Sequence, residues 1–228
     1  MTDQVRAFDI IGDVHGCFEE LVELLERLGY GRDGRTAPPG RQAVFLGDLV
    51  DRGPGVVEVC ELVMDMVEAG RATCVLGNHE HQFLRHLEGD FPLAWGLEET
   101  MGQLADHPPE TTARIEAFAR SLPPWLVLDD GRLIVVHAGL PEHLQGRDTP
   151  EARQFALYAD PVGTRRRDWA PAYRGEARVV YGHTAISDPA WVNRAICIDT
   201  GCVYGGALTA LRYPELELVT VPARHAWY

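Results

Sequence analysis

The chain has 228 residues, 46% hydrophobic and 24% charged, a composition typical of a globular protein with its own core. Its formal net charge is −13 and every basic residue is arginine, so we expect no binding to long duplex nucleic acid, which requires neutralising many phosphates. No apolar run approaches the ~18 residues of a membrane span and no secretory signal opens the chain, so we expect a cytoplasmic protein with no membrane partner.

The N-terminal half alternates apolar strands with helices. Three strands are predicted, over Ala7–Ile11, Ala43–Leu46 and Ala72–Leu76. Leucines at the spacing of one helix face, from Leu21 to Leu28, predict a helix after the first strand, and Val56 to Val67 form the next. Each strand runs into a glycine and then a polar residue, at the end where open α/β sheets carry their sites. The fold class is therefore predicted to be α/β.

Residues 89–124 differ in composition, because several prolines surround helical stretches such as Thr111–Ser121. This segment is predicted to be a cap-like insertion. From Trp125 onward the chain is rich in predicted strands: Leu126–Leu128, Arg132–Val136, Ala177–Tyr181, Ala195–Ile198, Ala207–Leu211 and Leu216–Val221. No linker or repeat interrupts the chain, so residues 1–228 are expected to form a single domain of β-sheets covered by helices.

Five short segments place polar side chains directly after apolar strands. They are GDVHG (12–16), GDLVDRG (47–53), GNHE (77–80), VVHAGL (135–140) and VVYGHT (179–184). Carboxylate and imidazole ligands together suit a first-row transition metal better than calcium. The stretch GNHEHQF is not a His-Glu-x-x-His zinc helix, because its fifth position from His79 is Phe83.

Taken together and in this order, the motifs resemble those of the calcineurin-like metallophosphoesterases, and within them the phosphoprotein-phosphatase branch. The stretches FALYADPVG and VNRAICIDTGCVYGGALTALRYPELELVTVP look like the phosphatase module of bacterial polynucleotide kinase-phosphatase. They look equally like small bacterial bis(5′-nucleosyl)-tetraphosphatase and serine/threonine phosphatase relatives. The resemblance spans roughly residues 7–222. It implies an α-β-β-α sandwich, with two mixed β-sheets flanked by helices and a small helical cap insertion.

The resemblance also implies a site for two divalent metal ions. Manganese is the expected metal, with iron, nickel and zinc as alternatives. Such a pair clamps phosphate oxygens and activates a water near neutral pH. In this chain, Asp13 and His15 would hold the first ion and Asp48 would bridge both. Asn78, His137 and His183 would complete the coordination of the second ion.

Three residues of the motifs are expected to act without binding metal. By the resemblance, His79 would protonate the leaving group, Asp51 would orient it, and Arg52 would clamp the phosphate. Glu80 is expected to support the site from behind. The run Arg165–Arg167 could meet a second phosphate of a polyphosphate, although a charge run more often forms a solvated face.

Substrate specificity stays open in the sequence, because His81 and Gln82 stand where relatives often carry a lysine. The first expectation is a manganese-dependent phosphomonoesterase resembling serine/threonine phosphatases, acting on a phosphorylated small molecule, nucleotide or phosphoprotein. The alternatives are a bis(5′-nucleosyl)-tetraphosphatase and a phosphatase of nucleic-acid ends or 2′,3′-cyclic phosphates, with an RNA-repair partner in the latter case. A non-catalytic binding module is disfavoured, because all six ligand positions are present.

Overall fold

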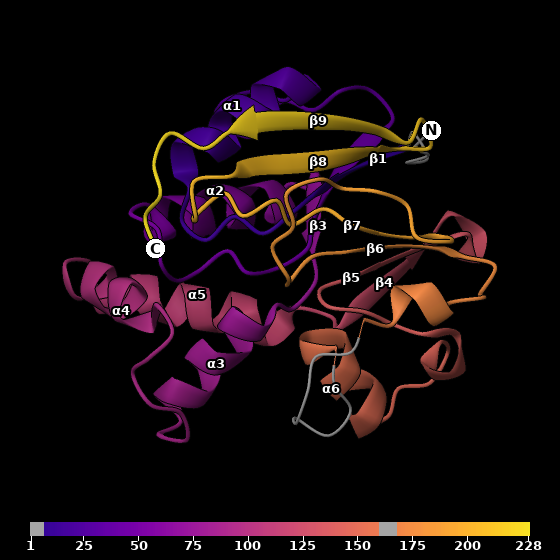
Figure 1. Ribbon diagram of the computed structural model, residues 1–228. Coiled ribbons are helices and arrows are strands. Elements are labelled where there is room, and N and C mark those ends of the chain that lie inside the picture. The colour runs from indigo at the N-terminus through magenta and orange to yellow at the C-terminus, as the bar shows by residue number, and fades with distance from the viewer. Residues whose placement is uncertain (1–6, 160–167) are drawn as a thin grey trace.

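The computed structural model describes residues 7–159 and 168–228. Two mixed β-sheets lie face to face between layers of helices (Figure 1). The first sheet has the order β3-β2-β1-β8-β9, in which β1, β2 and β3 are parallel and β8 and β9 antiparallel to their neighbours. Its strands are β1 (Ala7–Ile11), β2 (Arg41–Phe45), β3 (Ala72–Cys74), β8 (Ala207–Tyr213) and β9 (Glu217–Pro222).

The second sheet has the order β4-β5-β6-β7, with β5, β6 and β7 parallel and β4 antiparallel. Its strands are β4 (Trp125–Leu128), β5 (Leu133–Val136), β6 (Arg178–Tyr181) and β7 (Ala195–Cys197). Both sheets therefore contain three parallel strands, and the carboxyl ends of these strands carry the polar motifs. The predicted α/β sandwich of two mixed sheets is confirmed.

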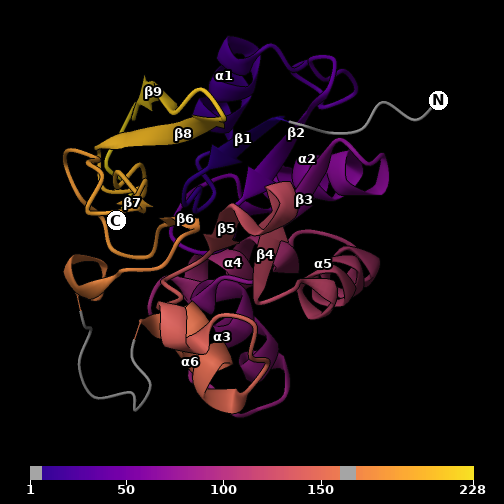
Figure 2. The ribbon, with the colours of Figure 1, turned by 90° about the vertical axis from the view of Figure 1, so that its right-hand side faces the viewer.

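Helices cover the outer face of each sheet. The helices are α1 (Phe18–Leu28), α2 (Val56–Glu68), α3 (Asn78–Leu87), α4 (Leu97–Ala105), α5 (Pro109–Ser121) and α6 (Pro150–Tyr158), with short 3-10 turns at Asp129–Gly131, Glu142–Leu144 and Ala170–Ala172. Figure 2 shows α1 beyond the first sheet and α6 beyond the second, with the strands between them. None of the helices in the described ranges is both long and apolar enough to cross a membrane.

The alternation of side chains along the strands explains the layering. On β2, Val44 points into the apolar layer between the two sheets, while Ala43 and Phe45 point toward the helices. All three are fully buried. A strand apolar on both faces needs cover on both faces, and the second sheet and the helices provide it.

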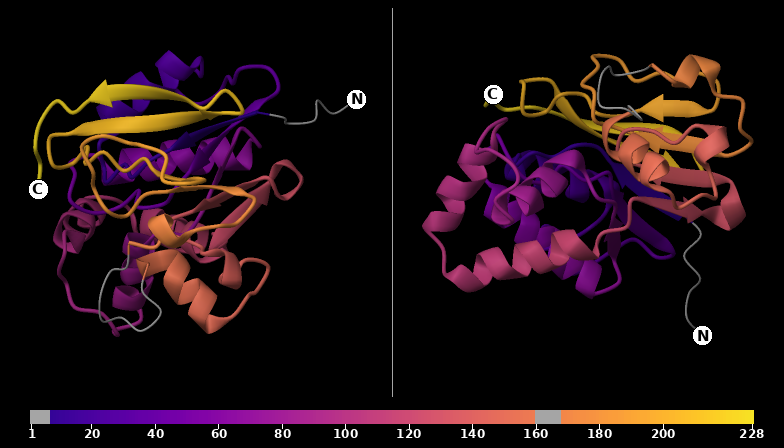
Figure 3. Two further views of the ribbon diagram at one scale, coloured as in Figure 1. Left: turned by 45° about the vertical axis from the view of Figure 1, so that its right-hand side comes forward. Right: turned by 90° about the horizontal axis from the view of Figure 1, so that it is seen from below.

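The predicted insertion, residues 89–124, contains α4 and α5. The two helices pack against each other and against α2, and α5 also contacts α3. In both views of Figure 3, the yellow C-terminal segment lies beside α4. The insertion therefore buttresses the helical layer, and of its described residues only Phe91 and Trp95 line the pocket described below.

One fully buried carboxylate lies within the first sheet, away from the polar motifs. Asp9, on β1, accepts hydrogen bonds from Arg41, Arg212 and the hydroxyl of Tyr30, at 2.8 to 3.2 Å. Two guanidinium groups thus compensate a charge that would be costly to bury alone.

Candidate metal centre and active site

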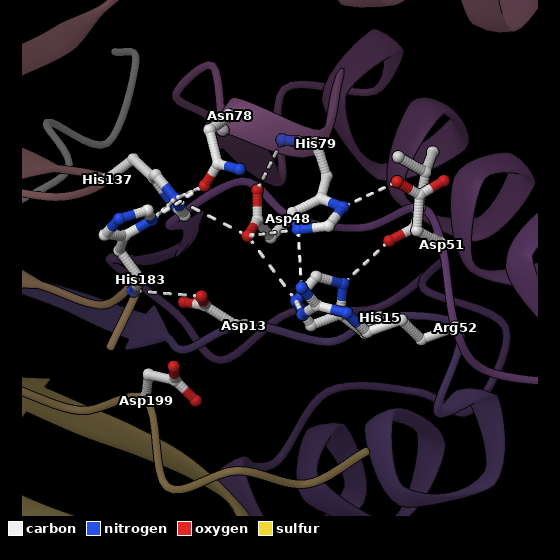
Figure 4. Close-up of polar contacts among 12 residues, drawn as sticks. Asp13, His15, Asp48, Asp51, Arg52, Asn78, His79, His137, His183 and Asp199 are labelled. Carbon is white, nitrogen blue, oxygen red and sulfur yellow. Dashed lines mark hydrogen bonds and ion pairs between the residues drawn. The ribbon is translucent and has the colours of Figure 1, made fainter. Parts of the chain in front are cut away.

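Polar side chains from six strand ends meet at one edge of the sandwich. They follow β1, β2 and β3 in the first sheet and β5, β6 and β7 in the second. They are Asp13, His15, Asp48, Asn78, His137, His183 and Asp199 (Figure 4). Because the carboxyl ends of the parallel strands of both sheets face the same edge, residues far apart in sequence become neighbours here. The structure thus brings together all six residues predicted as metal ligands.

The backbone turns sharply where it presents these side chains. His15, Asp48, Asp51, Arg52 and His183 have φ angles between 44° and 72°, in the left-handed region. Non-glycine residues in this region cost of order 1–3 kcal/mol and persist only where the surroundings impose them. Their concentration here indicates that side-chain direction at this edge is maintained at the expense of stability.

Asp48 lies at the centre of the cluster. Its Oδ2 is 3.4 Å from His15 Nε2, 3.5 Å from His137 Nε2 and 4.0 Å from His79 Nε2. Burial alone would raise its pKa, but the three imidazoles hold the pKa of Asp48 well below its usual range. Asp48 is therefore an ionised carboxylate shared by two groups of candidate ligands.

The protonation states of His15 and His137 follow from their hydrogen bonds. Nδ1 of His15 lies 2.8 Å from the carbonyl oxygen of Val50, and Nδ1 of His137 lies 2.9 Å from that of Leu46. A carbonyl oxygen only accepts, so each Nδ1 carries the proton and each Nε2 presents a lone pair to the cluster. Burial lowers the pKa of both imidazoles, which favours the neutral, metal-binding form.

Three potential ligand atoms converge beside Asp48. Asn78 Oδ1 lies 2.8 Å from His137 Nε2 and 2.7 Å from His183 Nδ1, and the two nitrogens are 3.2 Å apart. Since His137 Nε2 and Asn78 Oδ1 are both acceptors, their approach is unfavourable unless a cation or proton shares the position. This donor set suits a divalent transition metal.

The environment of Asp13 tests whether a cation fits at the first predicted metal position, that of Asp13 and His15. Its Oδ2 accepts from the backbone N–H of His183 at 3.0 Å, whereas its buried Oδ1 has no hydrogen-bond partner among the described residues. Burial, followed by the charges of Asp199 and Asp48, raises the pKa of Asp13. A divalent cation would satisfy the orphaned oxygen and offset the crowded carboxylates.

The residues present therefore fit two divalent ions sharing Asp48. One group consists of Asp48, His137 and His183, with Asn78 beside it. The other group consists of His15, Asp48 and His79. The sequence predicted Asp13, not His79, as the partner of His15 at this ion. However, Nδ1 of His79 is engaged by the carboxylate of Asp51.

His79 and Asp51 form a buried pair. His79 Nδ1 lies 2.5 Å from Asp51 Oδ2. Burial lowers the pKa of His79, but the charges of Asp48 and Asp51 outweigh it, and the net shift raises the pKa above its usual value. The imidazolium form that a general acid needs is thus stabilised.

Arg52 reaches both histidines of this half of the site. Its guanidinium nitrogens lie 2.6 Å from His15 Nε2 and 2.8 Å from His79 Nε2. Arginine only donates, so both Nε2 atoms accept in this arrangement. Arg52 must therefore turn away before His15 binds an ion and before His79 carries a proton on Nε2.

Glu80 supports the site from behind, as expected. Its carboxylate accepts from four backbone N–H groups, those of Asp48, Leu49, Val50 and Gly77, at 2.7 to 3.2 Å. It thereby joins the turn after β2 to the start of α3. Burial and the charge of Asp48 raise the pKa of Glu80 to about 7, against the opposing effect of these hydrogen bonds.

Sequence reasoning missed two residues of the site. Asp199 follows β7, lines the pocket and raises the pKa of Asp13. Its position directly after the apolar stretch Ala195–Ile198 repeats the pattern of the other ligands, and this signal could have identified it. Thr100, on α4, bonds to Asp51. No local signal marks it, because its partner lies in a different segment.

A pocket of about 740 Å³ opens over the cluster. Besides Asp48, Asn78, His79, His183 and Asp199, its described lining comprises Arg52, His81, Gln82, Arg85, Phe91, Trp95, Gln154, Tyr158, Thr184, Ala185 and Tyr204. His81 and Gln82 lie at this mouth, where specificity was expected to be decided, and His81 Nδ1 is 2.9 Å from the hydroxyl of Tyr158 on α6. The run Arg165–Arg167 lies outside the described residues.

Residues 7–219 match the family described as calcineurin-like phosphoesterase. The chain belongs to this family. Calcineurin-like phosphoesterases are hydrolases of phosphoester bonds that use two divalent metal ions, so the chain is an enzyme of this class. The resemblance inferred from the motifs is confirmed.

Similar curated proteins span almost the whole chain. A protein of Geobacillus sp. (strain WCH70) is 45% identical over 229 residues, covering 94% of each chain. One of Anoxybacillus flavithermus is 42% identical over 230 residues, covering 95% of this chain and 94% of the relative. Both are named bis(5′-nucleosyl)-tetraphosphatase PrpE [asymmetrical].

Solved structures show the same fold. A putative diadenosine tetraphosphatase superposes with a TM-score of 0.71 at 28% identity, over 96% of this chain and 94% of that one. A serine/threonine phosphatase from Saccharomyces cerevisiae superposes with a TM-score of 0.67 at 17% identity, over 98% of this chain and 81% of that one. The second likeness concerns the fold alone.

Proposed function

We propose that this calcineurin-like phosphoesterase is a manganese-dependent bis(5′-nucleosyl)-tetraphosphatase that cleaves dinucleoside tetraphosphates asymmetrically. The observation that carries the proposal is the identity of 42–45% to relatives of that name over nearly the full length of both chains. The phosphomonoesterase expected first from the sequence becomes the second candidate. An RNA-repair partner stays a prediction of the original resemblance.

The pocket supports a substrate larger than a single phosphate. Its volume of about 740 Å³ falls in the range of pockets for whole small-molecule ligands, roughly 300–1,000 Å³. Arg52 and Arg85 line it together with the exposed aromatic ring of Trp95. Guanidinium groups suit a polyphosphate and exposed rings suit a nucleobase.

The residues of the chain would divide the reaction between them. Two divalent ions held by the cluster would polarise the phosphoryl group and lower the pKa of a bound water. Arg52 would donate its planar fork to phosphoryl oxygens, moving from the two Nε2 atoms that it contacts in the structure. His79, freed on Nε2 and charged through Asp51, would protonate the leaving oxygen.

The ligand chemistry fits manganese and other divalent transition metals. Asp13, Asp48 and Asn78 offer oxygen, and the three histidines His15, His137 and His183 offer nitrogen. Such mixed sets suit divalent manganese, iron, nickel and zinc. Metal content by mass spectrometry, with activity after reconstitution by each metal, distinguishes them.

One observation favours the phosphomonoesterase as second candidate. The buried His79–Asp51 pair is an apparatus for protonating a leaving group. A nucleoside triphosphate leaves readily without a proton, whereas the alkoxide of a serine or threonine does not. The pair would therefore contribute most with an alkyl phosphate.

Parallel assays decide between the candidates. The manganese-loaded enzyme should be tested on diadenosine tetraphosphate, a phosphoserine peptide, p-nitrophenyl phosphate and 2′,3′-cyclic AMP, with products separated by chromatography. We expect the highest kcat/KM with diadenosine tetraphosphate, and ATP plus AMP as products. Two molecules of ADP would contradict asymmetrical cleavage, and a higher kcat/KM with the phosphopeptide would place the second candidate first.

A further inference from the structure

Two tyrosine rings lie against the guanidinium of Arg52. The Cζ atom of Arg52 is 5.4 Å from the ring centroid of Tyr204 and 5.3 Å from that of Tyr228. The two rings are themselves neighbours, with centroids 6.2 Å apart at an interplanar angle of 57°. Both Arg52 distances fall within the ~6 Å reach of a cation–π interaction.

The guanidinium of Arg52 also faces other groups of the site. Its Nε is buried and has no hydrogen-bond partner among the described residues, and its other nitrogens face the imidazoles of His15 and His79. The charge of Arg52 also acts on the carboxylate of Asp13, whose pKa it lowers against the larger opposing effect of burial. The π-faces of the two tyrosines therefore add a favourable contact to a partly desolvated cation.

Tyr204 and Tyr228 are held by backbone contacts that do not involve Arg52. The segment 223–228 folds back along the turn after β7: the N–H groups of Trp227 and Tyr228 both donate to the carbonyl of Val203, at 2.8 and 3.2 Å. An isolated β-bridge joins Tyr204 to Ala226. The backbone that carries the two rings is thus held by contacts that do not depend on Arg52.

The segment is also tied to α1. The backbone N–H of Arg224 donates to Glu20 Oε1 at 2.8 Å, and its guanidinium lies 3.4 Å from a carboxylate oxygen of Glu23. On the opposite side, the carbonyl of Gly96 accepts from the N–H of Arg52 at 3.1 Å, and a Cβ at Gly96 would lie 2.4 Å from Arg52 Cγ. Arg52 is confined between the insertion and this segment.

We propose that Tyr204 and Tyr228 are positioning residues that keep the guanidinium of Arg52 inside the site, where it meets a phosphoryl group. The inference rests on the proposed role of Arg52 as phosphate clamp. Arg52 turns from the histidines to the substrate, and the two rings keep its charged guanidinium group at the mouth of the pocket during that movement. Without them, the side chain gains rotamers directed to solvent, and phosphate binding must order it again.

The test compares substitutions that remove the ring with substitutions that retain it. We would prepare Tyr204→Leu and Tyr228→Leu, with Tyr204→Phe and Tyr228→Phe as conservative partners and Trp227→Leu as neighbouring control. The probe is inorganic phosphate, as competitive inhibitor of the manganese-loaded enzyme. Thermal melting establishes that each variant is folded.

We expect each leucine variant to weaken phosphate inhibition about two- to fivefold, the value of one exposed cation–π contact. KM should rise similarly while kcat changes less, and the phenylalanine variants and Trp227→Leu should resemble the parent. In an Arg52→Ala background, the effect of the leucine substitutions should disappear.

Three results would overturn this inference while leaving the proposed role of Arg52 in place. The first is an undiminished effect of Tyr228→Leu and Tyr204→Leu in the Arg52→Ala background. The second is equal loss in the phenylalanine variants. The third is a rise in KM for diadenosine tetraphosphate with unchanged phosphate inhibition, which would make the rings a nucleobase surface. If Arg52→Ala itself left phosphate inhibition unchanged, the clamp role proposed above would fail, and the inference with it.

Discussion

Thr100 and Asp51 exchange two hydrogen bonds across 49 positions of sequence. The Thr100 hydroxyl donates to Asp51 Oδ1 at 2.6 Å and accepts from the Asp51 N–H at 2.9 Å. Since Asp51 Oδ2 is engaged by His79, the threonine occupies the other oxygen and prevents rotation of the carboxylate. The insertion thus reaches the proposed acid through one fully buried hydroxyl.

Replacing Thr100 by valine should impair the acid without emptying the metal centre. Thr100→Val preserves shape but leaves two buried polar groups of Asp51 unpaired, which costs about 1–3 kcal/mol of stability. We expect kcat on a substrate with a poor leaving group to fall about tenfold or more. Thr100→Ser, which retains the hydroxyl, is the matched control. Loss of bound metal in Thr100→Val would contradict this role.

The pH dependence of kcat should report the His79–Asp51 pair. Burial lowers the pKa of His79, but the charges of Asp48 and Asp51 raise it by more than burial lowers it. The pKa therefore lies above its usual value, and the protonated form of His79 persists to higher pH. Activity on a poor leaving group should therefore be retained at low pH and fall as the pH rises through this raised pKa.

Asp51→Asn provides the check on this assignment. Removing the charge of Asp51 lowers the pKa of His79, so the descending limb of the profile should move to lower pH. With p-nitrophenyl phosphate, whose leaving group needs no proton, the profile should change little. A limb that stays in place in Asp51→Asn would assign it to another group.

Metal content should separate ligands from the acid. Asp48→Asn removes the carboxylate between both groups of candidate ligands, so it should lose most of both ions, whereas His183→Ala should lose mainly one. His79→Ala should retain both ions and lose most activity on poor leaving groups. Mass spectrometry of the purified variants measures this directly. Metal loss in His79→Ala would make His79 a ligand.

The stability of the first sheet should depend on Asp9. Asp9→Ala leaves the charges of Arg41 and Arg212 without their buried partner and should cost about 3–5 kcal/mol in urea unfolding. Glu215→Ala removes the exposed partner of Arg41 and should cost at most about 1 kcal/mol. Both variants, while folded, should retain the kcat of the parent. A similar loss of unfolding free energy in the two variants would contradict the view that the buried Asp9 contributes more than the exposed Glu215.

Features that depend on neighbouring residues in the sequence could be predicted. Apolar stretches such as Ala43–Leu46 predicted the strands, and the polar residues directly after them predicted the edge at which the candidate ligands meet. The helix α3 was not predicted, because Asn78–Leu87 is mostly polar and its first residues serve the site rather than the core.

Contacts between distant segments could not be predicted. Thr100 reaches Asp51 because α4 packs on α2, and Tyr228 reaches Arg52 because segment 223–228 folds back on Val203. Neither arrangement leaves a periodic pattern in the sequence. The order in which strands pair, including β1 beside β8, likewise depends on the packing of the whole chain.

The pairing of β1 with β8 has a consequence for how the enzyme acquires its metals. Phe8 lies opposite Tyr213, so the strand that leads into Asp13 and His15 completes its sheet only after most of the chain has been synthesised. Non-local strand pairs form slowly, because a long loop must close first. Ion binding should therefore follow completion of the sheet, and bound ions should slow the opening of both sheets together, because their ligands come from both.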